Sequence, residues 1–263
     1  MNQSPRRWIT ILIPPLVLLL LTMVVWQLAV MLLEIKPYLL PSPAAVVEAA
    51  IEHRGALFSA IWLTGRAAGL GLLVSILLGT ATALVFSQSR VVRRSFYPYA
   101  IALQTVPIVA IAPLIVNWFG EGFQSVVLVT VIISLFPVIT SVTTGLTSID
   151  EGLHDLFQLN QGSRWQQLVK LRIPSAIPSL VTGARTAAGL AVVGAIVGEF
   201  FAGASVTERG LGYFVLYAVP SLQTDLLFGC VIAATLLGVV MFVAVSLVGK
   251  HLLGRWTAEM ETH

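Results

Sequence analysis

The chain has 263 residues, of which 57% are hydrophobic and 10% are charged, and its mean hydropathy is +0.92. Soluble domains carry about 25% charged residues, so this composition excludes a water-soluble globular protein and indicates an integral membrane protein. The 15 Lys and Arg against 12 Asp and Glu give a net charge of only +3, which does not favour nucleic-acid binding. The single cysteine, Cys230, excludes a disulfide framework.

Stretches that lack Asp, Glu, Lys and Arg predict the membrane-spanning helices. A span of about 30 Å takes roughly 20 helical residues. Five stretches are long enough, and a sixth, 175–198, is equally apolar apart from Arg185. The five are 8–33, 67–89, 95–120, 122–149 and 226–249. We therefore expect an all-α integral membrane protein with six transmembrane helices. The first stretch exceeds the apolar core of about 7 to 15 residues of a signal peptide, which indicates an uncleaved anchor.

The distribution of basic residues predicts the orientation. A cytoplasmic N terminus puts ten Lys and Arg on the cytoplasmic side and four on the outer side, with Arg185 near the cytoplasmic side. The ten are Arg6, Arg7, Arg90, Arg93, Arg94, Arg164, Lys170, Arg172, Lys250 and Arg255, and the four are Lys36, Arg54, Arg66 and Arg209. Because basic residues are retained on the cytoplasmic side, both termini are expected there.

The segments around the first spans have their own patterns. Three prolines in 37–43 predict an extended stretch, and the apolar spacing in 44–53 predicts an amphipathic helix on the outer surface. Small residues repeat along 67–89 and 175–198, which favours close packing inside a bundle. Kinks are expected in the third and fourth spans at Pro107, Pro113, Pro137 and Gly145.

The cytoplasmic loop at 148–178 carries explicit helix signals. Ser148 with Glu151 and Ser163 with Gln166 each form the pattern of a capping box, which predicts two short helices separated by a turn at 160–162. Prolines are expected to stop the second helix and restart the chain as the fifth span. These are Pro174 and Pro178. Each helix has an apolar face, so the hairpin either folds back beneath its own bundle or docks a soluble partner.

The same loop resembles the permease subunits of binding-protein-dependent ATP-binding-cassette (ABC) importers. Their signature is Glu-Ala-Ala, three residues, Gly, nine residues, Ile, one residue and Leu-Pro. Aligned back from Pro174, Ile173 falls on the Leu, Leu171 on the Ile, and 155–157 on Glu-Ala-Ala. Gln161 falls on the Gly, which is displaced to Gly162, and both alanines are larger here. We therefore expect the turn and its packing to depart from the family pattern.

Further motifs follow the same order as in the nitrate, sulfonate, taurine and pyrimidine-precursor branch of these permeases, and they cover essentially the whole chain. They are LPSP at 40–43, ALQTVP at 102–107, APL at 112–114, WFG at 118–120, GSRWQ at 162–166, GAR at 183–185, EF at 199–200 and GLGY at 210–213.

The resemblance implies a type I ABC importer fold of six transmembrane helices in a bacterial inner membrane. Its segments are a cytoplasmic N terminus with the first span (1–33), a periplasmic segment with an amphipathic helix (34–66), a five-span core that contains the coupling loop 148–178 (67–249) and a cytoplasmic tail (250–263). The implied partners are a second permease chain, forming a homodimer, two cytoplasmic ATPase subunits, an external solute-binding protein and the lipid bilayer.

Energy is expected to come from another chain. Gly249 and Lys250 are followed by His251 and lack the upstream glycine-rich loop of an ATP site, so ATP and Mg would be bound by the partner ATPase. We expect no enzyme activity, metal or cofactor in this chain.

The coupling loop supplies the candidate ATPase-docking residues. Apolar side chains would fill a groove of the ATPase while charged ones fix the register at its rim. The candidates are Asp155, Leu156, Phe157, Gly162, Ser163, Arg164, Trp165, Leu168, Lys170 and Pro174.

Polar or kinked positions in the spans are the candidates for the translocation path, although isolated hydroxyls often bond their own helix. They are Gln104, Thr105, Pro107, Asn117, Ser134, Thr140 and Thr144. Glu199, with Gly210 and Gly212, is a candidate for the outer gate or for contact with the binding protein; alternatively Glu199 lies at the outer boundary, as Arg185 lies at the inner one.

Two other classes of membrane protein fit the sequence less well. An intramembrane enzyme is disfavoured because all four histidines lie in loops or tails. A secondary transporter remains the alternative, although no mid-membrane carboxylate for ion coupling is evident. The expected substrate is a small anion, a sulfonate or a pyrimidine or vitamin precursor, and the run 104–118 favours the last.

Overall fold

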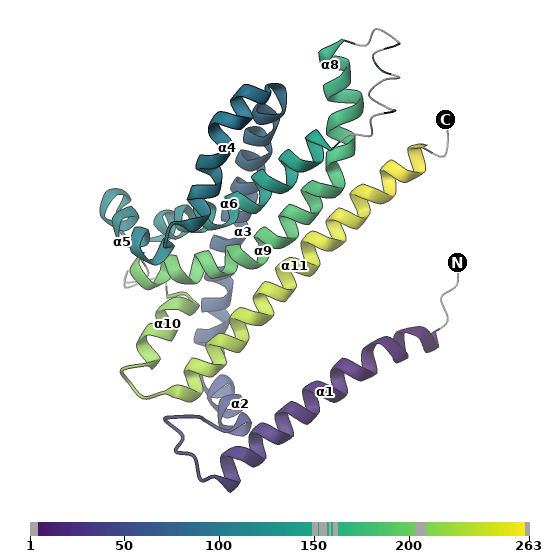
Figure 1. Ribbon diagram of the computed structural model, residues 1–263. Helices are drawn as coiled ribbons and strands as arrows, with labels where there is room; N and C mark the ends of the chain where they lie inside the picture. Colours follow the sequence, from purple (N-terminus) through teal and green to yellow (C-terminus); the bar gives the residue numbers. More distant parts are fainter. Residues whose placement is uncertain are drawn as a thin grey trace. The chain divides into compact units, whose positions relative to one another are not determined.

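The computed structural model consists mainly of helices in its described residues (Figure 1). It describes residues 5–148, 152, 157, 159, 163–202 and 209–260, with the side chains of 5–12, 103 and 253–260 left outside the description. In chain order the elements are α1 (Pro5–Leu32), α2 (Pro43–Glu52), α3 (Arg54–Gln88), α4 (Arg90–Thr105), α5 (Ile108–Phe119), α6 (Phe123–Thr147), α8 (Arg164–Gln167), η1 (Leu168–Arg172), α9 (Ile173–Ala202), α10 (Leu211–Ala218) and α11 (Thr224–Met260).

Five helical segments of the described chain are long and apolar enough to cross a membrane. They are Ile13–Leu32, Arg54–Gln88, Phe123–Thr147, Arg164–Ala202 and Thr224–Leu252. They correspond to five of the six expected spans and confirm the all-α membrane class.

The third expected span, 95–120, is divided into two helices. Helix α4 ends at Thr105, Val106 and Pro107 are extended, and α5 begins at Ile108. The break follows from Pro107, which has no backbone N–H to donate to the preceding turn and which disfavours helical geometry at Val106. The sequence predicted a kink at Pro107, and the structure has a full break there.

Two compact units make up the chain, and each is described by itself. The first comprises Met1–Phe58 and Phe214–Ala233, and the second comprises Ser59–Tyr213 and Ala234–His263. The first contains α2, which corresponds to the helix predicted over 44–53. This helix begins where Ser42 Oγ accepts a hydrogen bond from the backbone N–H of Ala45, with Pro43 in the first turn.

The second unit is built on α3, α6 and α9. Ser75 of α3 bonds Ser134 of α6 at 2.7 Å between their hydroxyl oxygens, and one turn further along both helices Gly79 faces Val138. Helices α3 and α6 are therefore parallel. Helix α9 is antiparallel to α6, since Gly183 faces Ser141 while Gly198 faces Val126. Because α3 and α6 run in the same direction, α4 and α5 return the chain from the end of α3 to the start of α6.

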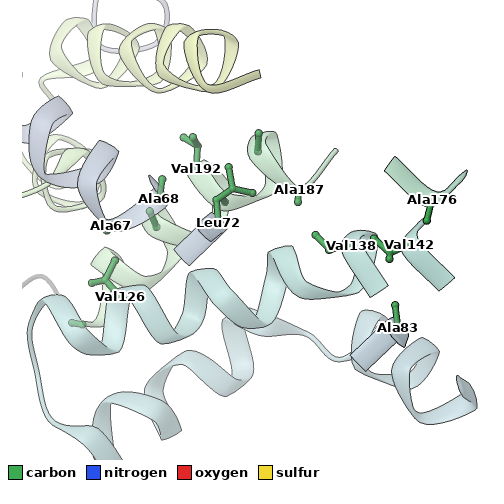
Figure 2. Packing of buried hydrophobic residues seen from close by; sticks show 14 of the residues in the cluster. Ala67, Ala68, Leu72, Ala83, Val126, Val138, Val142, Ala176, Ala187 and Val192 are labelled. Atoms are coloured by element: carbon green, nitrogen blue, oxygen red, sulfur yellow. The ribbon is translucent and has the colours of Figure 1, made fainter. Parts of the chain in front are cut away.

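Hydrophobic side chains, many of them alanine, fill the core between these helices, as Figure 2 shows for Ala67, Leu72, Val126, Val138 and Ala187. Gly71 of α3 lies so close to Thr130 of α6 that a Cβ would overlap the threonine side chain. Small residues let helix backbones approach closely, and van der Waals contact then stabilises the bundle where lipid offers no hydrophobic driving force. The predicted packing role of the small residues in 67–89 and 175–198 is confirmed.

Candidate functional site

The predicted capping box at Ser163 is confirmed and starts helix α8. The backbone N–H of Ser163 donates to Gln166 Oε1 at 2.9 Å, and the N–H of Gln166 donates to Ser163 Oγ at 3.2 Å. The helix presents Trp165 with 70% of its side chain exposed. A large aromatic side chain held outward by a short capped helix is typical of an anchor at a protein interface.

The other predicted docking residues fall into two groups. Arg164 and Lys170 are exposed, whereas Phe157, Leu168 and Pro174 are half-buried. The remaining predicted docking residues, Asp155, Leu156 and Gly162, lie outside the described residues. So do Glu151, which is the predicted capping partner of Ser148, and the predicted turn at 160–162.

Helix α8 continues without interruption through η1 into α9, so that residues Arg164–Ala202 form one helical segment of 39 residues. The prediction that Pro174 and Pro178 stop the helix is wrong. The N–H of Ile173 donates to Leu168 O, five residues back, and this wider π-helical turn accommodates a proline that has no N–H of its own. Arg172 Nη1 donates to Ser87 O at 2.9 Å and ties the turn to the end of α3.

A buried carboxylate joins three elements at the other end of α9. Glu199 is 3% exposed, and its two carboxylate oxygens accept hydrogen bonds from the Thr64 hydroxyl of α3 at 2.7 and 3.0 Å. The N–H of Gly212 donates to Glu199 Oε2 at 2.8 Å, and the N–H of Leu211 donates to Thr64 Oγ1 at 2.9 Å. We call these four residues the cross-tie. The carboxyl oxygens are hydrogen-bonded there because the first N–H groups of α10 have no partner within their own helix.

The glycines beside Glu199 explain part of the GLGY motif. A Cβ at Gly210 would overlap the Glu199 carboxylate, and a Cβ at Gly212 would lie 2.8 Å from Glu199 Cβ. The structure therefore brings the predicted trio of Glu199, Gly210 and Gly212 together. It adds Thr64, which the sequence analysis missed because a single threonine in an apolar stretch gives no local signal.

The hydrogen bonds of the predicted path residues do not bring these residues together at one site. Ser134 is fully buried and bonds Thr130 O and Ser75. The hydroxyls of Thr105, Thr140 and Thr144 donate to carbonyls of their own helices. Gln104 and Asn117 are exposed, and Pro107 precedes α5.

Two further observations concern charged groups. Arg185 Nε is buried and has no hydrogen-bond partner within the described part of the chain. No group of three or more His, Cys, Asp or Glu side chains that could hold a metal ion occurs among the described residues.

Comparison with known proteins places this architecture in a family. Residues 71–257 match the family described as binding-protein-dependent transport system inner membrane component. The chain is 35% identical over 240 residues to the formylaminopyrimidine transport permease protein ThiX of Halalkalibacterium halodurans, covering 91% of this chain and 94% of that protein. It is 33% identical over 244 residues to the riboflavin transport system permease protein RibX of Chloroflexus aurantiacus, covering 92% and 89%.

A third relative extends the comparison to a sulfonate. The chain is 30% identical over 226 residues to the taurine transport system permease protein TauC of Escherichia coli, covering 83% of this chain and 80% of that protein. These matches confirm the resemblance drawn from the motifs. The chain therefore belongs to the binding-protein-dependent transport system inner membrane components, the multi-pass permease subunits of bacterial ABC importers, which lack ATPase activity of their own.

Proposed function

We propose that this chain forms the translocation path of an ATP-driven importer and crosses the membrane six times, with both termini in the cytoplasm. The parallel course of α3 and α6 supports the sixth crossing, because α4 and α5 together must return the chain across the bundle. An importer of this family works with ATPase subunits and a binding protein. In our proposal two copies of the chain pair above two ATPase subunits.

The observation that carries the proposal is the continuous segment Arg164–Ala202. It connects Trp165, exposed at one end, with Glu199, buried in the cross-tie at the other. These residues are 34 positions apart, which is about 50 Å along a helix. A displacement of α8 by an ATPase subunit is therefore transmitted along one helix to the far end of the bundle, which is the mechanical requirement for alternating access.

In this mechanism each end of the segment has a defined task. Trp165 inserts into a groove of the ATPase with Phe157 and Leu168 beside it, while Arg164 and Lys170 contact the rim. At the other end Glu199 and Thr64 hold the start of α10 as part of the outer gate, where Gly210 and Gly212 permit the close approach. The exposed Gln104, Thr105 and Asn117 are the proposed contributors to the path.

The proposed substrate is a small solute delivered by the binding protein, within the class of small anions, sulfonates and pyrimidine or vitamin precursors. Relatives named for formylaminopyrimidine and riboflavin are 35% and 33% identical, and the relative named for taurine is 30% identical. This order favours a heterocyclic precursor.

The test of the docking assignment is Trp165→Ala. Removing a large interface anchor is expected to cost about 2 kcal/mol of association free energy. We expect the ATPase subunits to be lost during co-purification and uptake to fall, while the thermal unfolding midpoint of the full chain stays unchanged. Trp62→Ala is the matched control, because Trp62 is similarly exposed but lies on α3 near the cross-tie. Co-purification and uptake that both survive Trp165→Ala would contradict the assignment.

A second measurement separates ATP-driven import from secondary transport. Uptake is measured with an ATPase subunit that binds ATP but does not hydrolyse it. We expect uptake to stop, and continued uptake would instead support ion-coupled transport.

A further inference from the structure

Arg185 lies in the middle of the long helical segment Arg164–Ala202. It follows Arg172, at one end of the bundle, by thirteen residues and precedes Glu199, at the other end, by fourteen. Each interval is about 20 Å along a helix, which is farther than an arginine side chain reaches. The guanidinium group therefore lies at the depth of the transmembrane bundle and not at either end.

This guanidinium group has no partner. Among the described residues, no hydrogen bond or ion pair involves Arg185. Its Nε is buried, whereas its two terminal nitrogens are not. An unpaired charge at membrane depth is costly, and such residues face the interior of a bundle or a water-filled cavity. The tip of Arg185 thus reaches a side of α9 that the described chain leaves open.

The exposed residues of 175–198 form one face of α9, which we call the open face. They are Ser175, Pro178, Thr182, Thr186, Gly189 and Val193. Successive members are three or four residues apart, which places them in one line along the helix. Arg185 borders this line, three residues after Thr182 and four before Gly189. A Cβ at Gly189 would meet nothing within 4 Å, so the space beside it is open.

The open face differs from a surface that meets lipid. The part of α11 in the same unit exposes mainly large apolar side chains, which are Leu236, Val239, Val240, Phe242, Val243, Leu247 and Val248. The open face has hydroxyl groups and one branched apolar side chain, Val193. The hydroxyls of Thr182 and Thr186 donate to carbonyls of α9 at 3.0 and 3.3 Å, and their oxygens can still accept. Such a face beside an unpaired charge is suited to water and polar solutes.

We propose that the open face of α9 is part of the wall of the translocation path and that Arg185 binds the negatively charged group of the transported solute. The inference rests on the proposed function, because it requires a path through this chain. It adds what the path selects, which is a solute with a carboxylate, sulfonate or phosphate group. A planar guanidinium donates to two oxygens of such a group at once, and the terminal nitrogens of Arg185 are accessible for this contact.

The test measures which reagents reach the open face in the assembled importer, and it does not depend on the identity of the solute. Cys230, which is buried, is replaced by alanine, and one cysteine is introduced next to Arg185 as Thr186→Cys. The rate of its modification is measured in membrane vesicles that contain the permease with its ATPase and binding protein. The probes are two methanethiosulfonate reagents, the anionic sulfonatoethyl and the cationic trimethylammonioethyl compound, which both react from water.

We expect both reagents to modify Thr186→Cys, with the anionic one favoured relative to the rates of the two with a thiol in solution. Arg185→Gln is expected to lower the ratio of the anionic to the cationic rate about fivefold, because the nearby positive charge attracts one reagent and repels the other. The ratio cancels any effect of Arg185 on the reactivity of the thiol itself. Arg185→Lys retains the charge and should keep most of the ratio.

Two matched controls accompany these measurements. Val240→Cys places a cysteine on the exposed apolar face of α11 and should react with neither reagent. Arg90→Gln removes an exposed arginine outside the open face and should leave the ratio at Thr186→Cys unchanged. A thermal unfolding curve checks the fold of each variant. Should Arg185→Gln fold poorly, the ratio in the chain that keeps Arg185, compared with the thiol in solution, still tests for the charge.

Each other outcome decides against the proposal. Absence of modification of Thr186→Cys by both reagents overturns the open face as a wall of the path. An equal ratio with Arg185 and with Arg185→Gln overturns the role of the guanidinium. Both results are independent of the energy source: uptake that continues without ATP hydrolysis overturns the proposed function, while the accessibility and the ratio are still measured in the same vesicles.

Discussion

The two ends of the α3, α6 and α9 bundle differ in how their polar and large side chains are used. At the Glu199 end, the Glu199 carboxylate and the Thr64 hydroxyl bond each other and accept the backbone N–H groups of Gly212 and Leu211. At the Trp165 end, Trp165 is exposed, and Arg172 of η1 donates to Ser87 O of α3.

This difference separates residues that hold the chain together from residues that meet other molecules. Substitutions at the Glu199 end should lower the stability of the isolated chain, because the bonds broken there are internal. Substitutions of the exposed residues at the Trp165 end should leave that stability unchanged and act on binding.

The largest effect is expected from Gly212→Ala. The new Cβ would lie 2.5 Å from Ile196 O and 2.8 Å from Glu199 Cβ, and neither a backbone oxygen nor a Cβ can move without shifting α9. Overpacking of this kind should cost about 3 kcal/mol of unfolding free energy. The measurement is the thermal unfolding midpoint of the purified chain, with uptake measured in parallel.

Gly238→Ala in α11 is the matched control, since a Cβ there meets nothing within 4 Å. Its midpoint should be unchanged or raised, because alanine favours a helix over glycine. If the two variants unfold at the same temperature, the packing around Glu199 does not limit stability and the comparison fails.

A smaller effect is expected from Thr64→Val. Valine has the shape of threonine but no hydroxyl, so Glu199 loses a donor and the N–H of Leu211 loses its acceptor. Leaving these buried groups unbonded should cost about 2 kcal/mol. The measurement is again the unfolding midpoint.

Thr64→Ser keeps the hydroxyl and should retain most of the stability that Thr64→Val loses. A serine variant as unstable as the valine variant would show that Thr64 acts through packing of its methyl group and not through the cross-tie.

The smallest effect is expected from Arg172→Gln at the Trp165 end. It removes the hydrogen bond from Arg172 Nη1 to Ser87 O, which is partly buried, and should cost about 1 kcal/mol. The same midpoint measurement applies, with Arg90→Gln as an exposed control. A loss as large as that of Thr64→Val would mean that both ends are held by internal bonds to the same extent.

Local patterns predicted much of the fold. The start of α8 follows from Ser163 and Gln166, because a helix cap is formed by neighbouring residues. The absence of charge over some twenty residues was enough to locate four of the five spans, and the fifth was located although it contains Arg185. Glu199 was recognised as a candidate because a carboxylate is rare in such surroundings.

Features that depend on distant residues were not predictable in the same way. The partner of Glu199 is Thr64, 135 residues away, and no local spacing links them. The rule that proline ends a helix failed at Pro174 because the preceding turn widens; in that turn Leu171 is buried and Arg172 bonds Ser87.

The cross-tie also constrains the order in which the protein is made. Thr64 leaves the ribosome well before Glu199, and Leu211 and Gly212 follow after it. When α9 is delivered to the membrane, the Thr64 hydroxyl is the one partner of the carboxylate already synthesised. Pairing of α9 with α3 as it inserts therefore lowers the cost of placing Glu199 in an apolar helix, and it links an early and a late part of the chain during assembly.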